Sequence, residues 1–201
     1  MRLFFSLLAI AISFFSANVY AADRYEFDKE HTTILFYVNH LGFSDMIGEF
    51  TDYDGFFTFD PQKPEDSSVD VTLRPIGIRT SSSALDSDLQ GDKFFRSDEF
   101  PTIHFVSKKI KPKGAKTGEI YGDLTLLGVT KPAILTVHFN KADYHPITKN
   151  FMAGFSASAK IKRSDFGMAE YVPMVGDEVR IEVQTEGINI DQKAREAMKR
   201  K

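Results

Sequence analysis

Hydrophobic and polar positions alternate with a period of two along much of the chain after about residue 30. The clearest run places Ile34, Phe36 and Val38 on one face, and His40 ends that face. Alternation of this kind is typical of a β-strand with one buried side. We therefore predict a strand at 34–40 whose apolar face points into the core.

The same pattern predicts seven further strands, at residues 48–60, 69–75, 103–107, 119–127, 133–140, 153–161 and 177–188. In the first of these segments the apolar positions change parity midway, so we place a bulge or bend at Asp54-Gly55. Gly128 and Pro132 are typical turn residues, and they indicate a hairpin between the fifth and sixth predicted strands.

Two segments depart from the period of two. Residues 81–91 are rich in Ser and Asp and place Leu85 and Leu89 four positions apart, which predicts a helix of one or two turns. Residues 191–201 hold five basic and two acidic side chains. This basic tail is predicted to be either a short, frayed helix or disordered.

The predicted strands are joined by short connections and do not alternate with helices, which argues against a parallel sheet. The fold class is therefore all-β, and an eight-stranded antiparallel barrel with one short helical excursion fits best. At this strand number the interior either fills with side chains or holds one small elongated ligand. A β-sandwich is the structural alternative.

The N-terminus has the layout of a secretory signal peptide. Arg2 precedes an apolar run at 3–15, and small or polar residues lead to Ala21, which predicts cleavage after about Ala21. An uncleaved anchor is the alternative. The chain is thus divided into a signal peptide at 1–21, a barrel at 22–190 and the basic tail at 191–201, with no stable membrane span after cleavage.

Composition and charge exclude several classes of protein. A formal net charge of −3 gives no electrostatic footprint for nucleic acid. The absence of Cys excludes disulfides, thiol chemistry and Cys-based metal sites. A secreted chain without Cys fits a bacterial periplasm. The 19 Phe and the absence of Trp indicate either a Phe-rich core or a cavity lined by rings, and composition does not separate the two.

Motifs for catalysis and metal binding are missing from the sequence. The five His form neither His-x-His nor His-Glu-x-x-His, and Gly-x-Ser-x-Gly, P-loop and Gly-x-Gly-x-x-Gly motifs do not occur. We predict no catalytic residue, no metal and no cofactor, although a carboxylate pair assembled only in space would leave no spacing to recognise. Arg163 and Asp165 form either a salt-bridged turn or polar contacts at a barrel mouth.

Short motifs occur in order along nearly all of the predicted mature chain. They are Tyr25-x-Phe-Asp28 with His31, Phe36-x-Val-x-His40-x-Gly42, Gly48-x-Phe50, Asp92-x-Phe-Phe95, Phe100-Pro-x-Ile-x-Phe105, Gly122-Asp-Leu-Thr-Leu126, Gly128-Val-Thr-Lys-Pro132, Arg163-Ser-Asp-Phe-Gly167 and Val175-Gly-Asp-Glu-Val179. In order and spacing the set resembles the YceI-like family of secreted lipid-binding proteins. The resemblance implies a lipocalin-like barrel, a bound polyisoprenoid or other long amphiphilic lipid, and a non-enzymatic role in lipid or isoprenoid-quinone binding.

The inward faces of the predicted strands, read together with this resemblance, suggest which side chains contact a ligand. The predicted cavity lining is Ile34, Phe36, Val38, Phe57, Phe59, Leu73, Ile103, Phe105, Leu124, Leu126, Phe155 and Ile161. Leu89, Phe94 and Phe95 are predicted to close one mouth, and His40, Arg163 and Asp165 are the candidate polar contacts.

If the interior is fully packed, the same apolar residues are plain core. The protein would then be a stress-related periplasmic interaction protein without a lipid ligand. A third hypothesis is an enzyme acting on a hydrophobic substrate. The sequence leaves the oligomeric state open, with a homodimer as one option.

Overall fold

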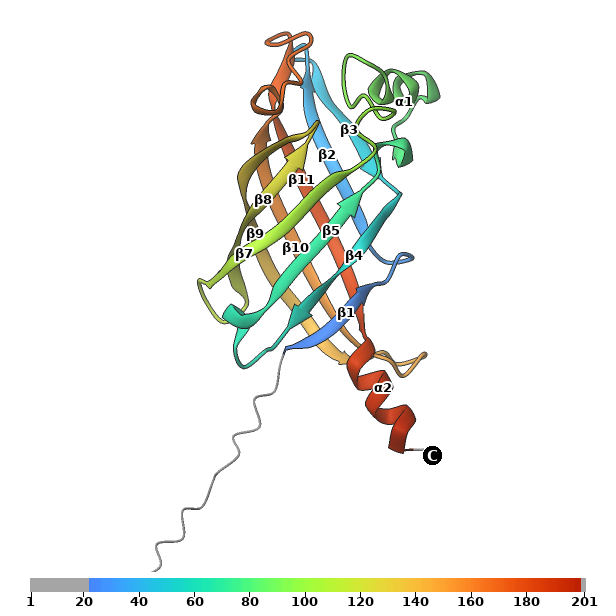
Figure 1. Ribbon diagram of the computed structural model, residues 1–201, viewed down its shortest axis with the longest axis vertical. Helices are drawn as coiled ribbons and strands as arrows, with labels where there is room; N and C mark the ends of the chain where they lie inside the picture. Colours follow the sequence, from blue (N-terminus) through green and yellow to red (C-terminus); the bar gives the residue numbers. More distant parts are fainter. Residues whose placement is uncertain (1–21, 200–201) are drawn as a thin grey trace, which may run out of the picture.

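The structure is a computed structural model that describes residues 22–199, so the predicted signal peptide lies outside the described residues. Within 22–199, eight strands close an antiparallel barrel (Figure 1). Around the ring they are β1 (Asp23–Phe27), β4 (Tyr53–Phe59), β5 (Ser68–Leu73), β7 (Ile103–Pro112), β8 (Thr117–Leu126), β9 (Val129–Tyr144), β10 (Phe151–Lys162) and β11 (Val175–Asn189), which returns to β1. The predicted all-β, eight-stranded antiparallel barrel is confirmed.

The sheet branches at β11, the strand that completes the ring. One end of β11 pairs with β1, where Tyr25 lies opposite Asn189. Its other end pairs with β2 (Thr33–His40), and the branch continues through β3 (Ser44–Phe50) to β6 (Ile78–Arg79). Strand β1, which the sequence analysis did not predict, is therefore a member of the closed ring, whereas the predicted strand at 34–40 lies in the branch.

The predicted strand at 48–60 is wrong in one respect, because the structure divides it into β3 and β4. The break falls at Thr51 and Asp52 rather than at Asp54-Gly55. Thr51 donates its amide to the carbonyl of Gly77, at 3.1 Å, and Asp52 accepts from the amide of Arg74, at 2.8 Å. These two bonds occupy the backbone at the break, and the chain crosses from the branch to the ring there.

The hairpin between β8 and β9 turns at Leu127 and Gly128, whose φ angles are 51° and 73°. Positive φ at both central residues is the geometry of a two-residue hairpin turn, which favours Gly. The prediction that Pro132 belongs to this turn is wrong, because Pro132 lies in β9 opposite Asp123.

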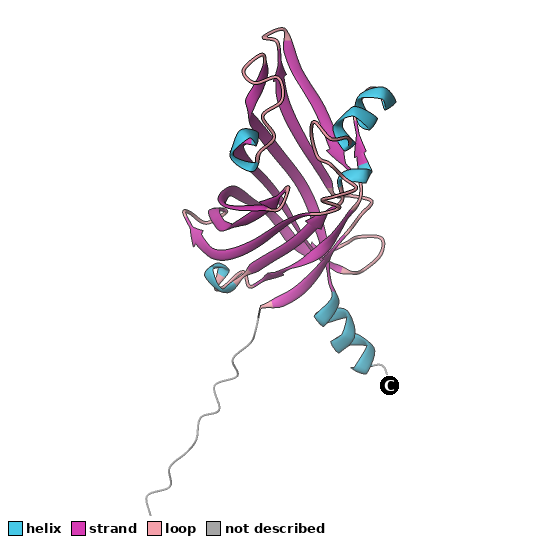
Figure 2. Ribbon diagram, turned by 45° about the horizontal axis from the view of Figure 1, so that its top comes forward, coloured by secondary structure: helices cyan, strands magenta, loops and turns pink. Residues whose placement is uncertain are grey.

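Short helices lie at the ends of the barrel (Figure 2). The predicted helix is confirmed as α1 (Ser83–Gln90), in which the Ser82 side chain accepts a hydrogen bond from the Leu85 amide. Of the two alternatives for the basic tail, helical or disordered, the structure shows the helical one as far as Lys199, in α2 (Ile190–Lys199). Three 3₁₀ helices complete the fold: η1 (Pro64–Asp66), η2 (Pro75–Gly77) and η3 (Arg163–Phe166). Within 22–199, no helix is long and apolar enough to cross a membrane.

The interior has a packed half and a hollow half. The packed half lies next to α1, where the rings of Phe36, Phe50 and Phe95 meet with centroid separations of 5.4 to 6.4 Å. Leu89 of α1 and Phe166 of η3 are buried in the same cluster. These side chains fill one end of the barrel, so an interior ligand has room only in the other half.

Candidate functional site: an apolar cavity in the barrel

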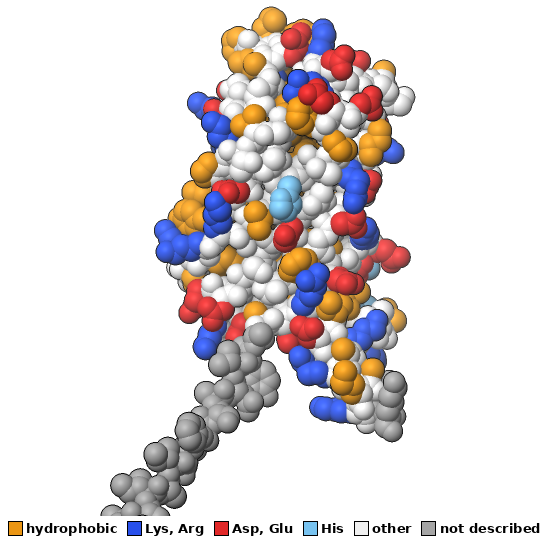
Figure 3. Space-filling view, viewed as in Figure 1, with side chains coloured by type: hydrophobic (Ala, Val, Ile, Leu, Met, Phe, Trp, Pro, Cys, Tyr) orange, Lys and Arg blue, Asp and Glu red, His pale blue; other side chains and the backbone are white. Residues whose placement is uncertain are grey.

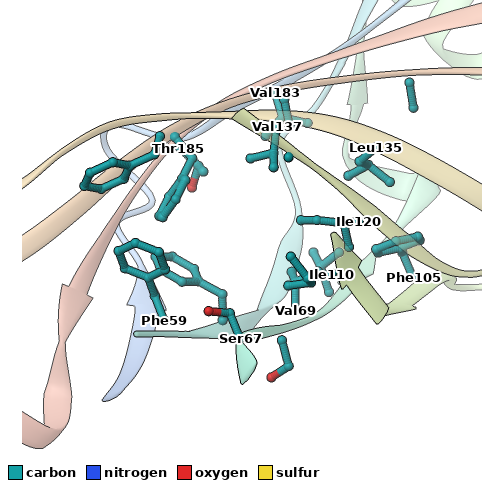
Figure 4. A pocket seen from close by; sticks show the side chains of 18 of the residues that line it. Phe59, Ser67, Val69, Phe105, Ile110, Ile120, Leu135, Val137, Val183 and Thr185 are labelled. Atoms are coloured by element: carbon teal, nitrogen blue, oxygen red, sulfur yellow. The ribbon is translucent and has the colours of Figure 1, made fainter. Parts of the chain in front are cut away.

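The hollow half contains a cavity of about 290 Å³. Side chains from many strands point into this common space, including Phe59 of β4, Ile120 of β8 and Val137 of β9 (Figure 4). Its size is close to the lower end of the range for pockets that hold small organic ligands. The cavity can therefore accept a slender apolar molecule.

Small side chains on β10 leave this space open. Ala157 and Ala159 line the cavity where larger residues would fill it. Beside them, the ring of Phe155 meets the rings of Phe57 and Phe59 edge-on, with centroids 5.4 and 5.0 Å apart. The alanines thus provide room, and the three rings provide a rigid aromatic wall.

The cavity opens through the barrel wall between β5 and β7. These strands pair only from Asp70 to Leu73, and β7 then continues with β8 alone. Beyond the paired segment, the amide of Val69 donates to the hydroxyl of Ser107, at 2.9 Å. The two lips of the mouth are the β4–β5 connection, with Pro61, Pro64 and Ser67, and the β7–β8 turn at 112–117.

The lining is apolar apart from a few hydroxyl groups and one ammonium group. Among the described residues that line the cavity, Lys116 is the only one with an ionisable acidic or basic side chain apart from the phenol of Tyr53. Tyr53 is buried and donates to the carbonyl of Thr32, at 3.2 Å. Burial raises the pKa of the Tyr53 phenol, which favours its neutral form.

The structure brings eight of the predicted site residues together around the cavity. They are Ile34, Phe57, Phe59, Leu73, Phe105, Leu124, Phe155 and Ile161. Seven other predicted residues belong to or pack against the packed half and do not line the cavity. They are Phe36, Val38, Leu89, Phe94, Phe95, Ile103 and Leu126.

The three polar candidates lie away from the cavity. His40 is exposed at the end of β2, and Asp165 is exposed in η3. Arg163 is only 3% exposed, and its guanidinium donates to the carbonyls of Met168, Val175 and Gly176 at 2.8 to 2.9 Å. One of these acceptors lies in the connection between β10 and β11 and two are the first residues of β11, so Arg163 fixes the connection to the start of that strand.

Sequence reasoning missed the residues of the mouth. Lys116 lies in a turn and Thr117 is the first residue of β8, before the predicted strand begins, so no periodicity indicates which way their side chains face. Three further lining residues carried a usable signal. Ile120 and Val137 lie on the inward faces of predicted strands, and Ile110 lies in the part of β7 that extends beyond the predicted end at 107.

A second, polar hollow of about 270 Å³ lies outside the barrel near His31 and His145. Here ligand-type atoms of Asp28, His31 and Glu186 lie within 4.8 Å of one another. His31 Nδ1 is 2.9 Å from an Asp28 carboxylate oxygen, and this ion pair accounts for the closeness of those two groups. That hydrogen bond raises the pKa of His31.

A closed eight-stranded antiparallel barrel with an apolar cavity places the protein in the class of small barrels that can hold one ligand inside. The chain belongs to the YceI-like family, because the YceI-like domain matches residues 25–187.

Several proteins match this chain over most of their own length. A UPF0312 protein of Pseudomonas savastanoi pv. phaseolicola is 36% identical over 163 residues, which cover 80% of this chain and 84% of that protein. Among solved structures, the Campylobacter jejuni YCEI protein matches with a TM-score of 0.69 and 30% identity, over 75% of this chain and 88% of that one. A polyisoprenoid binding domain from Saccharophagus degradans shares the fold, with a TM-score of 0.62 and 9% identity over 82% and 98% of the two chains.

Proposed function

We propose that this protein is a periplasmic carrier for a polyisoprenoid or isoprenoid-quinone-like amphiphile whose hydrocarbon chain lies in the barrel. The observation that carries the proposal is the apolar cavity of about 290 Å³ with one mouth in the wall. Burial of hydrocarbon contributes about 0.8 kcal/mol per CH₂. Ten buried methylenes would thus contribute about 8 kcal/mol, from which an association cost of about 4 kcal/mol or more is subtracted.

The proposal assigns ligand contact to the eight predicted residues that line the cavity and a packing role to the predicted residues in the packed half. It is supported by the family, and the Saccharophagus degradans domain that shares the fold is called a polyisoprenoid binding domain. Binding rather than catalysis is proposed because the described lining contains no His, Asp, Glu or Arg that could act as an acid, a base or an oxyanion donor.

The periplasmic part of the proposal rests on the signal peptide predicted at 1–21, on the lack of Cys and on the family. Cell fractionation tests the location, and N-terminal sequencing of the exported protein tests cleavage after about Ala21. Light scattering on the same preparation measures whether it is a homodimer.

The decisive experiment is mass spectrometry of an organic extract from native protein. We expect a polyprenyl or quinone species in a stoichiometric amount, which would also identify the ligand. If folded protein yields an empty extract and still binds nothing after incubation with polyprenyl alcohols and quinones, the carrier function is refuted. The stress-related interaction protein would then become the working hypothesis, and the search would turn to protein partners.

A further inference from the structure

The mouth of the cavity carries one ammonium group on an otherwise uncharged lining. Lys116 lies in the β7–β8 turn, is exposed to solvent, and lines the cavity together with its neighbours Ala115 and Thr117. Its ammonium donates to the carbonyl of Asn140, at 3.2 Å. An ammonium has three donors, so this bond anchors the group at the mouth and leaves two donors for another acceptor.

The hairpin around Lys116 is strongly basic. Residues 108–116 contain five lysines and no acidic residue, and the apolar side chains of Ile110 and Pro112 line the cavity between them. Basic side chains also gather at the left edge of the molecule, at the height where Figure 1 draws this hairpin (Figure 3). The hairpin therefore presents an apolar face to the cavity and a positive charge to its rim.

Carboxylates neutralise only part of this charge. Lys108 pairs with Asp123 at 2.5 Å, and Lys113 pairs with Glu119 at 3.1 Å. Within residues 22–199, neither Lys111 nor Lys116 forms an ion pair with a carboxylate, and Lys111 lies over the ring of Tyr121 instead. Within residues 22–199, three of the five lysines thus form no ion pair with a carboxylate: Lys109, Lys111 and Lys116. Of these, Lys116 is the one that lines the cavity.

The opposite lip, the β4–β5 connection at 60–67, is acidic overall, with three carboxylates and one lysine, Lys63. Glu65 and Asp66 belong to η1, are exposed, and lie beside β7. These carboxylates repel an anion and direct it towards the β7–β8 turn. A chain that enters the cavity must leave its polar end at this mouth, because the lining beyond it offers no charged partner.

We propose that the mouth selects amphiphiles with an anionic head group, a phosphate or a carboxylate, and that Lys116 contacts that head while the hydrocarbon lies inside. This inference rests on the proposed carrier function and narrows its ligand class, because a quinone head is neutral. A charge-assisted hydrogen bond from Lys116 would favour the anionic ligand about tenfold over a neutral one of equal chain length.

The test is calorimetric titration of the full mature protein with a C15 prenyl monophosphate and with the C15 prenyl alcohol. We expect the monophosphate to bind about tenfold more tightly at low ionic strength, and the difference to shrink as salt is added. Lys116→Gln should bring the two affinities together, and Lys116→Arg should restore the preference. Lys131→Gln is the matched control, because Lys131 is an exposed residue of β9 that does not line the cavity.

The possible outcomes separate this inference from the proposed function. Equal affinity of wild-type protein for the two probes overturns the head-group preference but leaves the carrier. A preference that survives in Lys116→Gln overturns the assignment to Lys116. If neither probe binds, the carrier function fails as well. Inorganic phosphate alone should not bind at the same concentration, and tight binding of free phosphate would show an anion site unrelated to the lipid and refute the proposal.

Discussion

Replacing Ala157 by Phe should block the cavity from inside without changing its mouth. Ala157 lies in β10 between Val137 of β9 and Val183 of β11, and all three side chains line the cavity. The substitution adds a six-carbon ring to that space. A ligand that loses room for about six carbons loses about 5 kcal/mol at 0.8 kcal/mol per CH₂, so its affinity should fall more than a thousandfold.

The assay is titration of purified variants with a C20 prenyl alcohol, together with thermal unfolding followed by circular dichroism. Ser158→Phe is the matched control, because Ser158 is the next residue of β10 and is exposed on the outer face. It introduces the same ring outside the barrel and should bind like wild type. If Ala157→Phe folds with a normal melting transition and binds the alcohol as wild type does, the ligand does not occupy this cavity and the reasoning is refuted.

Three further substitutions test the roles of individual side chains. Arg163→Met should lower the free energy of unfolding by about 3–5 kcal/mol, because three carbonyls lose a buried charged donor. Urea titration measures this change, and an unchanged unfolding midpoint would contradict it. Asp28 raises the pKa of His31 above its ordinary 6.5, so their ion pair stabilises the fold fully below that pH and is lost as the pH rises through the raised pKa. Unfolding measured from about pH 6 to 8 should show this loss in wild type and not in His31→Gln. Gly48→Val should cost about 1–3 kcal/mol, since its Cβ would overlap the ring of Phe36. A wild-type melting temperature would argue against that contact.

Local pattern was enough to predict most strands because each long strand buries one face. Residues 155–161 of β10 and 179–183 of β11 alternate between apolar and polar or small side chains, and α1 carries a cap at Ser82 and two Leu four positions apart. Strand β1 could not be predicted in this way. It has five residues, and its role depends on partners more than 160 positions away, since Tyr25 pairs with Asn189.

The break between β3 and β4 was visible in the sequence but was placed wrongly. Phe50 and Tyr53 are both buried, and an odd separation between inward residues requires an irregularity between them. The prediction assigned it to Gly55 because glycine is the usual marker. The structure places it at Thr51, where a hydrogen bond to the distant residue Gly77 fixes the chain, and no local signal reports such a bond.

The sequence predicted which side chains of the candidate site face the interior, but not where along the barrel axis each one lies. A period of two shows that Phe36 and Phe57 both face inward, but it carries no information on the position of each residue along the barrel axis. Phe36 meets Phe50 and Phe95 in the packed half, whereas Phe57 lines the cavity. The difference arises because Leu89 of α1 packs into one end of the interior, whereas among residues 22–199 no helix fills the other end.

This division of the interior separates stability from binding. The ring cluster around Phe36 and the buried Arg163 lie in the half that adjoins α1 and η3, and they hold that end together without contacting the cavity. The mouth is formed by the β4–β5 and β7–β8 connections, where β5 and β7 no longer pair. Because few backbone hydrogen bonds link these two lips, they can separate to admit a chain while the packed half stays intact. If the barrel carries a lipid as proposed, we expect entry to move these two connections and to leave the packed half unchanged.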